Sequence, residues 1–346
     1  MQQSSMNPTR ILRRQVLART VIGLAGALLA CTFAGSALAQ EKLIPLRVGY
    51  DGYSMTTAPM SFALKKGIFK KHGIDLTLVY VDGGPTLTQA VVGGSVDIGQ
   101  NGYTPVAAAA VAGADLVFIG GISNKLPFQL VVKNEIKNAA DLKGKKIAIS
   151  RYGSSTDTAA TFAVENLGLK RTDVSILQLG GEGTRTAAML SGQIDASLEQ
   201  YPRTAELMEQ GYHVLVDVTG VAGDYPNTSY VTRRAFVEKN PDTVKRFMAA
   251  ISEGIHVFKT NRTEAEQATA EFLKLKIDKV MDITYTRYVD DIFPDVPAPS
   301  LKGIQIVLDE LKAKIPAAAK FTPEQLVDTR ALDQLKAEGF FDTLKK

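Results

Sequence analysis

The chain of 346 residues contains no tryptophan, a single cysteine and only three histidines. Cys31 has no second cysteine with which to form a disulfide, so the folded chain must be stabilised by core packing. The histidines (His72, His213 and His256) are far apart and lack the spacing of zinc ligands. The sequence therefore predicts neither a metal site nor a cofactor.

Residues 1–39 have the pattern of an export signal. Four arginines precede the apolar stretch 21–33, which is too short to span a membrane, and small residues ending at Ala39 predict cleavage there. The pair Arg13-Arg14 also resembles a twin-arginine signal, and the residues before Cys31 resemble those of a lipoprotein, in which this cysteine is lipidated. We expect a periplasmic protein, either free or carrying a lipid anchor at Cys31.

Charge and motifs narrow the class of function. Residues 1–39 hold four arginines and no acid, which leaves 36 basic and 36 acidic residues in the rest of the chain. This balance favours neither nucleic acid nor an anionic membrane as a partner. The motifs G-x-S-x-G, G-x-x-x-x-G-K-[ST] and, after a strand, G-x-G-x-x-G are missing. The sequence therefore predicts no catalytic residue and no nucleic-acid partner.

The same βαβαβ pattern occurs twice, from Leu46 to Pro105 and from Lys145 to Pro202. The closest match is GGSVDIG at 93–99 against SGQIDAS at 191–197. Its two aspartates, Asp97 and Asp195, are expected to be structural partners at a strand edge. Alternation of strands and helices predicts an α/β class with mostly parallel sheets, here as two lobes with a cleft between them.

The rest of the chain sets the predicted domain limits. Residues 240–346 read as helices only, and we expect this all-helical tail to pack on the first lobe. Two short segments, LPFQLVV at 126–132 and TSYVT at 228–232, read as strands where the chain crosses between lobes, which predicts a two-strand hinge. The predicted domains are a signal peptide (1–39), lobe 1 (44–130 plus 227–346) and lobe 2 (131–226).

Ligands of open parallel sheets bind beyond the carboxyl ends of the strands, which selects the loops that follow them. The loop at 150–156 is the strongest candidate. Its glycine and hydroxyl residues open a helix whose free N–H groups favour an anion, and Arg151 adds a cation. The alternative is that Ser154 only caps this helix, although a cap and a ligand can share one helix start.

From these loops and the second crossing we predict the following ligand-binding residues: Tyr53, Ser54, Gly102, Tyr103, Arg151, Gly153, Ser154, Ser155, Thr156, Gln200, Tyr201 and Asn227. Arg151 is expected to hold the anionic end of the ligand, with Tyr53 and Tyr201 on either side of the remainder. The carboxylates that an enzyme could use in the second lobe are Glu182 and Glu199.

Four segments resemble a known family: 58–78, 93–102, DLKGKKIAISRYGSSTD at 141–157, and 190–197. They are similar to the periplasmic solute-binding proteins of ABC importers for nitrate, taurine and aliphatic sulfonates, a family that includes carriers of the thiamine pyrimidine precursor. The resemblance implies a type II periplasmic binding protein fold, with Ser154, Ser155 and the loop around Tyr53 facing the ligand. The chain departs from the family in having no tryptophan after Asp195, and Arg151 is not expected of every member.

The sequence thus predicts a monomeric substrate-binding protein that delivers a small organic anion to the transmembrane subunits of an ABC permease. The anion would be a carboxylate or a sulfonate, with aromatic acids among the candidates. Three alternatives remain open: a carrier of a neutral pyrimidine-like ligand, a lyase or dehydratase on the same fold, and a sensor that presents its closed form to a signalling partner.

Overall fold

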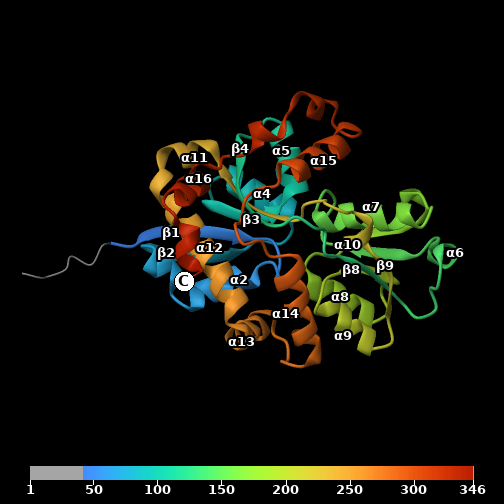
Figure 1. Ribbon diagram of the computed structural model, residues 1–346. Helices are drawn as coiled ribbons and strands as arrows, with labels where there is room; N and C mark the ends of the chain where they lie inside the picture. The colour runs from blue at the N-terminus through green and yellow to red at the C-terminus, as the bar shows by residue number, and fades with distance from the viewer. Residues whose placement is uncertain (1–41, 346) are drawn as a thin grey trace, which may run out of the picture. The chain divides into compact units, whose positions relative to one another are not determined.

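The structure is a computed structural model that describes residues 42–345, in which two five-stranded sheets are each flanked by helices (Figure 1). The predicted signal sequence and Cys31 lie outside the described residues. Among residues 42–345, no helix is both long and apolar enough to cross a membrane.

The first sheet has the strand order β2-β1-β3-β10-β4. β1 pairs in parallel with β2 and β3, whereas β10 runs antiparallel to β3 and β4. Its strands are β1 (Ile44–Tyr50), β2 (Ile74–Tyr80), β3 (Ile98–Gly102), β4 (Leu116–Ser123) and β10 (Thr228–Arg233).

The second sheet repeats this plan with the order β7-β6-β8-β5-β9. β6 pairs in parallel with β7 and β8, and β5 runs antiparallel to β8 and β9. Its strands are β5 (Gln129–Val132), β6 (Lys146–Ile149), β7 (Ser175–Gln178), β8 (Ala196–Glu199) and β9 (His213–Asp217). The duplicated pattern in the sequence thus corresponds to two sheets of one topology.

Each sheet takes its antiparallel strand from a crossing of the chain. β5 enters the second sheet after β4, and β10 returns to the first sheet after β9. The two-strand hinge is confirmed. The residue limits of the lobes remain a proposal, and the limit at 130 needs adjustment because Gln129 and Leu130 already pair with β8.

The two aspartates of the repeat make equivalent contacts in the two lobes. Asp97 Oδ2 accepts a hydrogen bond of 2.9 Å from the backbone N–H of Arg47 in β1, and Asp195 Oδ2 accepts one of 3.0 Å from Lys146 in β6. Each carboxylate also forms an ion pair, Asp97 with Arg47 and Asp195 with Lys133. The predicted structural role at the strand edge is confirmed.

Helices cover both sheets. Around the first sheet they are α2 (Ala58–Lys65), α3 (Ile68–Lys71), α4 (Gly84–Val92), α5 (Tyr103–Val111) and α11 (Arg234–Lys239). Around the second they are α6 (Ala139–Leu142), α7 (Ser155–Asn166), α8 (Glu182–Leu190), α9 (Arg203–Glu209) and α10 (Val218–Val221). Short 3₁₀ helices lie at Arg171–Asp173, Pro316–Lys320 and Pro323–Leu326.

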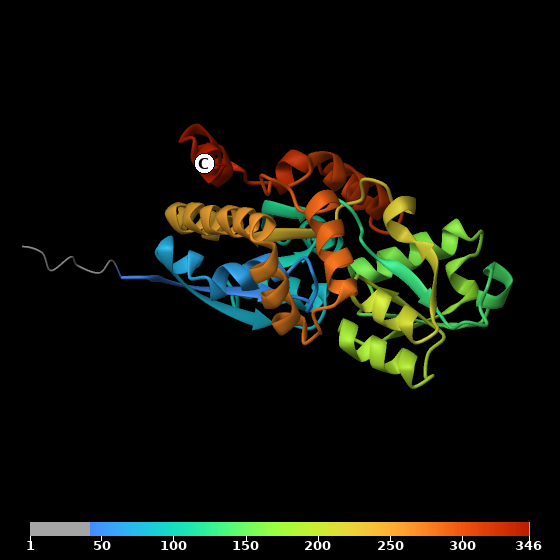
Figure 2. The ribbon, with the colours of Figure 1, turned by 60° about the horizontal axis from the view of Figure 1, so that its bottom comes forward.

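The tail is helical, as predicted. It comprises α12 (Pro241–Thr260), α13 (Arg262–Leu273), α14 (Lys279–Asp291), α15 (Leu301–Lys312), α16 (Arg330–Ala337) and α17 (Phe340–Leu344). The long helix α12 lies along the first lobe in two views (Figures 1 and 2), where Phe247, Ile251 and Phe258 join the core formed with β1, β2 and α2. α14 also reaches the second lobe, since Tyr288 donates a hydrogen bond of 2.9 Å to Gln200.

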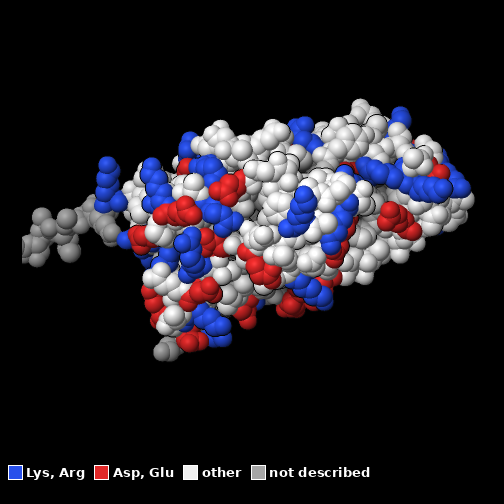
Figure 3. All heavy atoms as spheres, turned by 90° about the horizontal axis from the view of Figure 1, so that it is seen from above, with Lys and Arg blue, Asp and Glu red and all other residues white. Residues whose placement is uncertain are grey.

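Basic and acidic side chains are mixed on the surface of the protein. Basic and acidic side chains alternate over the left half of the face in Figure 3, where most belong to the first lobe and its tail. This mixture agrees with the balance of 36 basic and 36 acidic residues outside the first 39.

Candidate functional site

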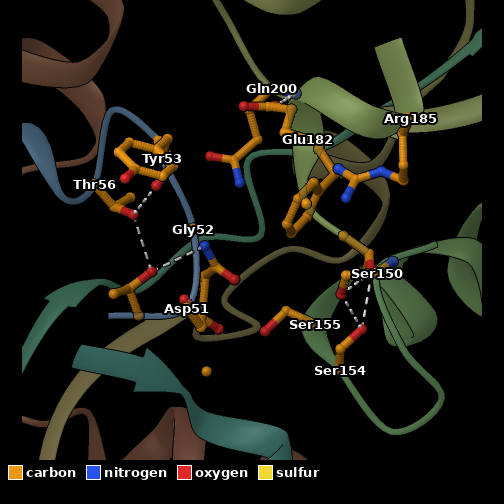
Figure 4. Close-up of a pocket in the computed structure, with 17 residues that line it drawn as sticks. Asp51, Gly52, Tyr53, Thr56, Ser150, Ser154, Ser155, Glu182, Arg185 and Gln200 are labelled. Atoms are coloured by element: carbon orange, nitrogen blue, oxygen red, sulfur yellow. Dashed lines mark hydrogen bonds between the residues drawn. The ribbon is translucent and has the colours of Figure 1, made fainter. Parts of the chain in front are cut away.

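A cavity of about 70 Å³ is lined by residues of both lobes (Figure 4). The first lobe contributes the loop after β1, the end of β3 and the start of β10, and the second contributes the starts of α7 and α8 and the end of β8. The lining residues are Asp51, Gly52, Tyr53, Ser54, Thr56, Gly102, Phe128, Ser150, Ser154, Ser155, Thr156, Gly181, Glu182, Arg185, Gln200, Asn227 and Thr228. The cavity therefore lies where the topology rule places a ligand, at the carboxyl ends of the strands.

Most of the predicted site residues line this cavity: Tyr53, Ser54, Gly102, Ser154, Ser155, Thr156, Gln200 and Asn227. Tyr103, Arg151, Gly153 and Tyr201 do not. The lining also contains Phe128 and Arg185, which are not among the predicted residues and lie outside the loops that follow the parallel strands.

The start of α7 forms the second-lobe wall. Ser154 is the N-cap, and its Oγ accepts a hydrogen bond of 3.3 Å from the Asp157 N–H, so the capping interpretation holds. Ser150 donates to Ser154 Oγ at 2.9 Å, which fixes the cap hydroxyl. Ser155 Oγ has no hydrogen-bond partner among residues 42–345. Together with the first N–H groups of the helix, which lack acceptors within it, this hydroxyl offers donors to an acceptor or an anion in the cavity.

Gln200 and Thr56 add fixed polar groups. Tyr288 donates to Gln200 Oε1 at 2.9 Å, and the backbone N–H of Gln200 donates to Glu182 Oε1 at 2.9 Å. The Gln200 amide nitrogen makes no hydrogen bond to a described residue, so a further donor remains. On the opposite wall Thr56 Oγ1 lies 2.9 Å from Ser54 Oγ and 3.4 Å from Thr228 Oγ1. Both walls can therefore bind a small polar solute through several hydrogen bonds.

Arg185 is the cation of the cavity. Its side chain is 3 % exposed and donates to the carbonyl oxygens of Gly180 (2.7 Å) and Leu198 (2.9 Å). Its Nε lies 3.7 Å from Oε1 of the fully buried Glu199. Arg185 follows the glycine-rich segment 180–184 after β7, and an arginine next to a loop at the carboxyl end of a strand is the sequence signal that points to it.

Two lining carboxyl groups have raised pKa values. Burial raises the pKa of Glu182 to about 8, with a further contribution from the nearby Glu199 carboxylate, and burial raises the pKa of Asp51 to about 7. Burial also raises the pKa of Glu199, against the effect of Arg185. At neutral pH, Glu182 and Asp51 are therefore protonated in a large fraction of molecules and repel an anion less than two fixed carboxylates would.

Three further predicted residues lie outside the cavity: the two tyrosines because their rings pack elsewhere, and Gly153 because it lies in the turn before α7. Tyr103 is fully buried, with its ring 4.7 Å from that of Phe118. Tyr201 packs against the first-lobe core beneath Arg287, whose guanidinium lies 5.3 Å from the ring centre. Gly153 has a φ of 76° and turns the chain into α7 without lining the cavity.

Arg151 contacts the other lobe and does not line the cavity. Its Nε donates to the Asp82 carbonyl at 2.9 Å, and its Nη2 donates to Asp82 Oδ2 at 2.8 Å. The loops are in tight contact here, since a Cβ added to Gly83 would lie 2.7 Å from Arg151 Cδ. The pair Arg151–Asp82 therefore joins the lobes in this conformation, and the prediction that Arg151 holds the ligand disagrees with its position.

We expect Arg151→Ala and Asp82→Ala each to weaken ligand binding by about 0.5–1 kcal/mol, since a half-exposed ion pair contributes little. The double variant should be no weaker than either single variant, because each removes the same contact between lobes. Titration calorimetry measures all three. A loss above tenfold for Arg151→Ala with none for Asp82→Ala would instead show that Arg151 touches the ligand.

No group of three or more His, Cys, Asp or Glu side chains between residues 42 and 345 is placed to hold a metal ion. The cavity's polar groups are hydroxyls, amides, carboxyls and one guanidinium, which suit hydrogen bonding to an organic or oxyanion ligand.

Known proteins are similar to this chain in sequence. The model of the NMT1/THI5-like family matches residues 54–265. A relative in Escherichia coli, named as an aliphatic sulfonates-binding protein, is 32 % identical over 73 % of this chain and 77 % of its own length. The resemblance seen in the sequence is confirmed.

Solved structures share the fold. A protein of Bordetella bronchiseptica superposes with a TM-score of 0.76 at 25 % identity, covering 85 % of this chain and 97 % of its own. The periplasmic aliphatic sulphonate binding protein SsuA of Escherichia coli superposes with a TM-score of 0.63 at 26 % identity, covering 82 % and 92 %. The chain therefore belongs to the NMT1/THI5-like family and has the type II periplasmic binding protein fold.

Proposed function

We propose that this protein is the substrate-binding protein of an ABC importer. It captures a small organic anion, a carboxylate or a sulfonate, in the inter-lobe cavity and delivers it unchanged to the transmembrane subunits of a permease. Export to the periplasm by residues 1–39 and action as a monomer belong to the same proposal.

The observation that carries this proposal is the joint lining of one cavity by both lobes. The start of α7 and Arg185 belong to the second lobe, whereas Tyr53 and Thr56 belong to the first. A ligand that contacts both walls is bound more tightly when the lobes are together, so it shifts the population towards the closed form without any chemical step. The unpartnered donors at Ser155 and Gln200 favour an acceptor-rich group such as a carboxylate or sulfonate.

A second candidate is a neutral, amine-bearing heterocycle of the pyrimidine type. The observation that favours it is the presence of Asp51 and Glu182 in the lining, since either carboxylate can accept a hydrogen bond from an amine. Glu182 is the observation that favours the third candidate, an enzyme. A carboxyl group with a pKa of about 8 can act as an acid or a base near neutral pH.

A thermal-shift screen over carboxylates, sulfonates and aminopyrimidines separates the ligand classes. A ligand at 100 times its Kd stabilises the fold by about 2.7 kcal/mol, enough for a clear rise in Tm. We expect organic anions to raise the Tm, and Ser155→Ala to reduce that rise. Ser191→Ala, which changes an exposed serine outside the cavity, is the control and should leave it intact. A rise with aminopyrimidines alone would contradict the anion proposal.

A further inference from the structure

Four aromatic side chains form a continuous patch beside the cavity. Tyr50 ends β1, Tyr53 lies in the loop that follows, Tyr80 ends β2 and Phe272 comes from α13. The ring centre of Tyr53 lies 5.0 Å from that of Tyr80, 5.2 Å from that of Phe272 and 5.5 Å from that of Tyr50. We call this set the aromatic patch.

The patch connects the cavity to solvent. Tyr53 lines the cavity and is nevertheless 45 % exposed, and Tyr80 is 39 % exposed. The hydroxyl of Tyr80 lies at the edge of the second lobe, since a Cβ on the cavity residue Gly181 would lie 2.9 Å from it. The two exposed rings therefore lie at the junction of the lobes, next to the polar cavity.

The exposed rings are held in place from behind. Tyr50 is 6 % exposed, Phe272 is partly buried against the first-lobe core, and both pack on Tyr53. Tyr80 donates a hydrogen bond of 3.1 Å to Asp82, so its hydroxyl has a partner while much of its ring remains exposed. An aromatic part of a ligand can stack on rings that are exposed to water and already fixed. Binding then costs little side-chain entropy, because these rings need not be ordered further.

The size of the cavity decides which part of a ligand it holds and which part reaches the aromatic patch. The cavity volume of about 70 Å³ is several times the ~10–15 Å³ that a single water requires. It can therefore take a carboxylate or sulfonate group. Tyr53 lies at the exposed side of the cavity, so a ligand with more than an acid group extends past Tyr53 towards Tyr80.

We infer that the aromatic patch is a second subsite, in which Tyr53 and Tyr80 bind the uncharged aromatic part of the organic anion whose acidic group occupies the cavity. This inference rests on the proposed function and adds the ligand class: an aryl sulfonate or aryl carboxylate, in preference to a short alkyl one.

The test compares matched ligands by titration calorimetry: methanesulfonate with benzenesulfonate, and acetate with benzoate. In the wild-type protein the aryl member of at least one pair should bind about tenfold more tightly or better, the scale of burying one ring. Tyr80→Leu should reduce this ratio at least threefold while the alkyl member keeps its affinity, because Tyr80 does not line the cavity. Tyr80→Phe, which keeps the ring and removes the hydroxyl, should retain the ratio.

The outcomes distinguish the two proposals. If alkyl and aryl members bind equally well, or if Tyr80→Leu leaves the ratio unchanged, the second subsite is wrong and the anion-binding function stands. If no member of either pair binds, the proposed function fails, and this inference fails with it.

Discussion

Replacing Arg185 by alanine is expected to lower the free energy of unfolding by about 3–5 kcal/mol, because it leaves a buried carboxylate without its cation. Glu199 is fully buried, and Arg185, 3 % exposed, is the cation that lies 3.7 Å from it. The substitution also removes hydrogen bonds to two backbone carbonyl oxygens. Urea denaturation of the wild type and the variant measures the difference.

The control removes both charges. Arg185→Met combined with Glu199→Gln leaves no unpaired ion in the same volume, and we expect it to recover at least half of the lost stability. A double variant as unstable as Arg185→Ala would show that the arginine acts through its hydrogen bonds alone. A loss below 1 kcal/mol for Arg185→Ala would contradict the buried ion pair itself.

Replacing Gly102 by alanine is expected to weaken ligand binding by about 1–3 kcal/mol, the usual cost of overpacking. Gly102 has a φ of −64°, which any residue can adopt, so the backbone of the first lobe tolerates the change. The added Cβ would lie 2.3 Å from Ser155 Oγ of the second lobe. The Ser155 hydroxyl must then rotate away from its place in the cavity, or the lobes must stay further apart, and either change removes contacts with the ligand. Within the first lobe the atom nearest to the added Cβ would be Pro105 Cδ, at 3.3 Å, so each lobe should stay folded.

Gly220→Ala is the matched control, since a Cβ at Gly220 meets no atom within 4 Å and the residue is outside the cavity lining. Calorimetry should find its affinity equal to that of the wild type, with about a 5- to 150-fold loss for Gly102→Ala. Small-angle scattering should show ligand-induced compaction in the control and less in Gly102→Ala. An unchanged affinity in Gly102→Ala would mean that ligand binding does not require this approach of the lobes.

The fold could be predicted because each lobe has the same order of strands, helices and turns, and this βαβαβ pattern can be read from neighbouring residues in both copies. The two aspartates of the matched segments, Asp97 and Asp195, occupy equivalent strand edges, and the loops after the parallel strands supply most of the cavity lining. Spacing along the chain is sufficient for such features, because the topology of a parallel sheet brings these loops to one edge.

The remainder of the site depends on contacts between distant segments. Arg151 pairs with Asp82 of the other lobe, and Tyr201 lies beneath Arg287 of the tail. Neither partner can be read from the residues around it. The place of Arg185 depends on packing in the same way: this residue of α8 reaches the cavity because α8 packs against β8, where Arg185 donates to the Leu198 carbonyl. Sequence pattern thus locates loops, and tertiary packing decides which side chains of those loops face the ligand.

Titration calorimetry with recovery of the ligand tests the central claim most directly. The most stabilising ligand from the thermal-shift screen is titrated into the protein, which is then denatured so that the released ligand can be identified by mass spectrometry. We expect one ligand bound per chain, a single binding isotherm and complete recovery of the unchanged molecule. Continued heat release with excess ligand, together with a product of different mass, would contradict the account and identify Glu182 as the first candidate for an acid or base in an enzyme.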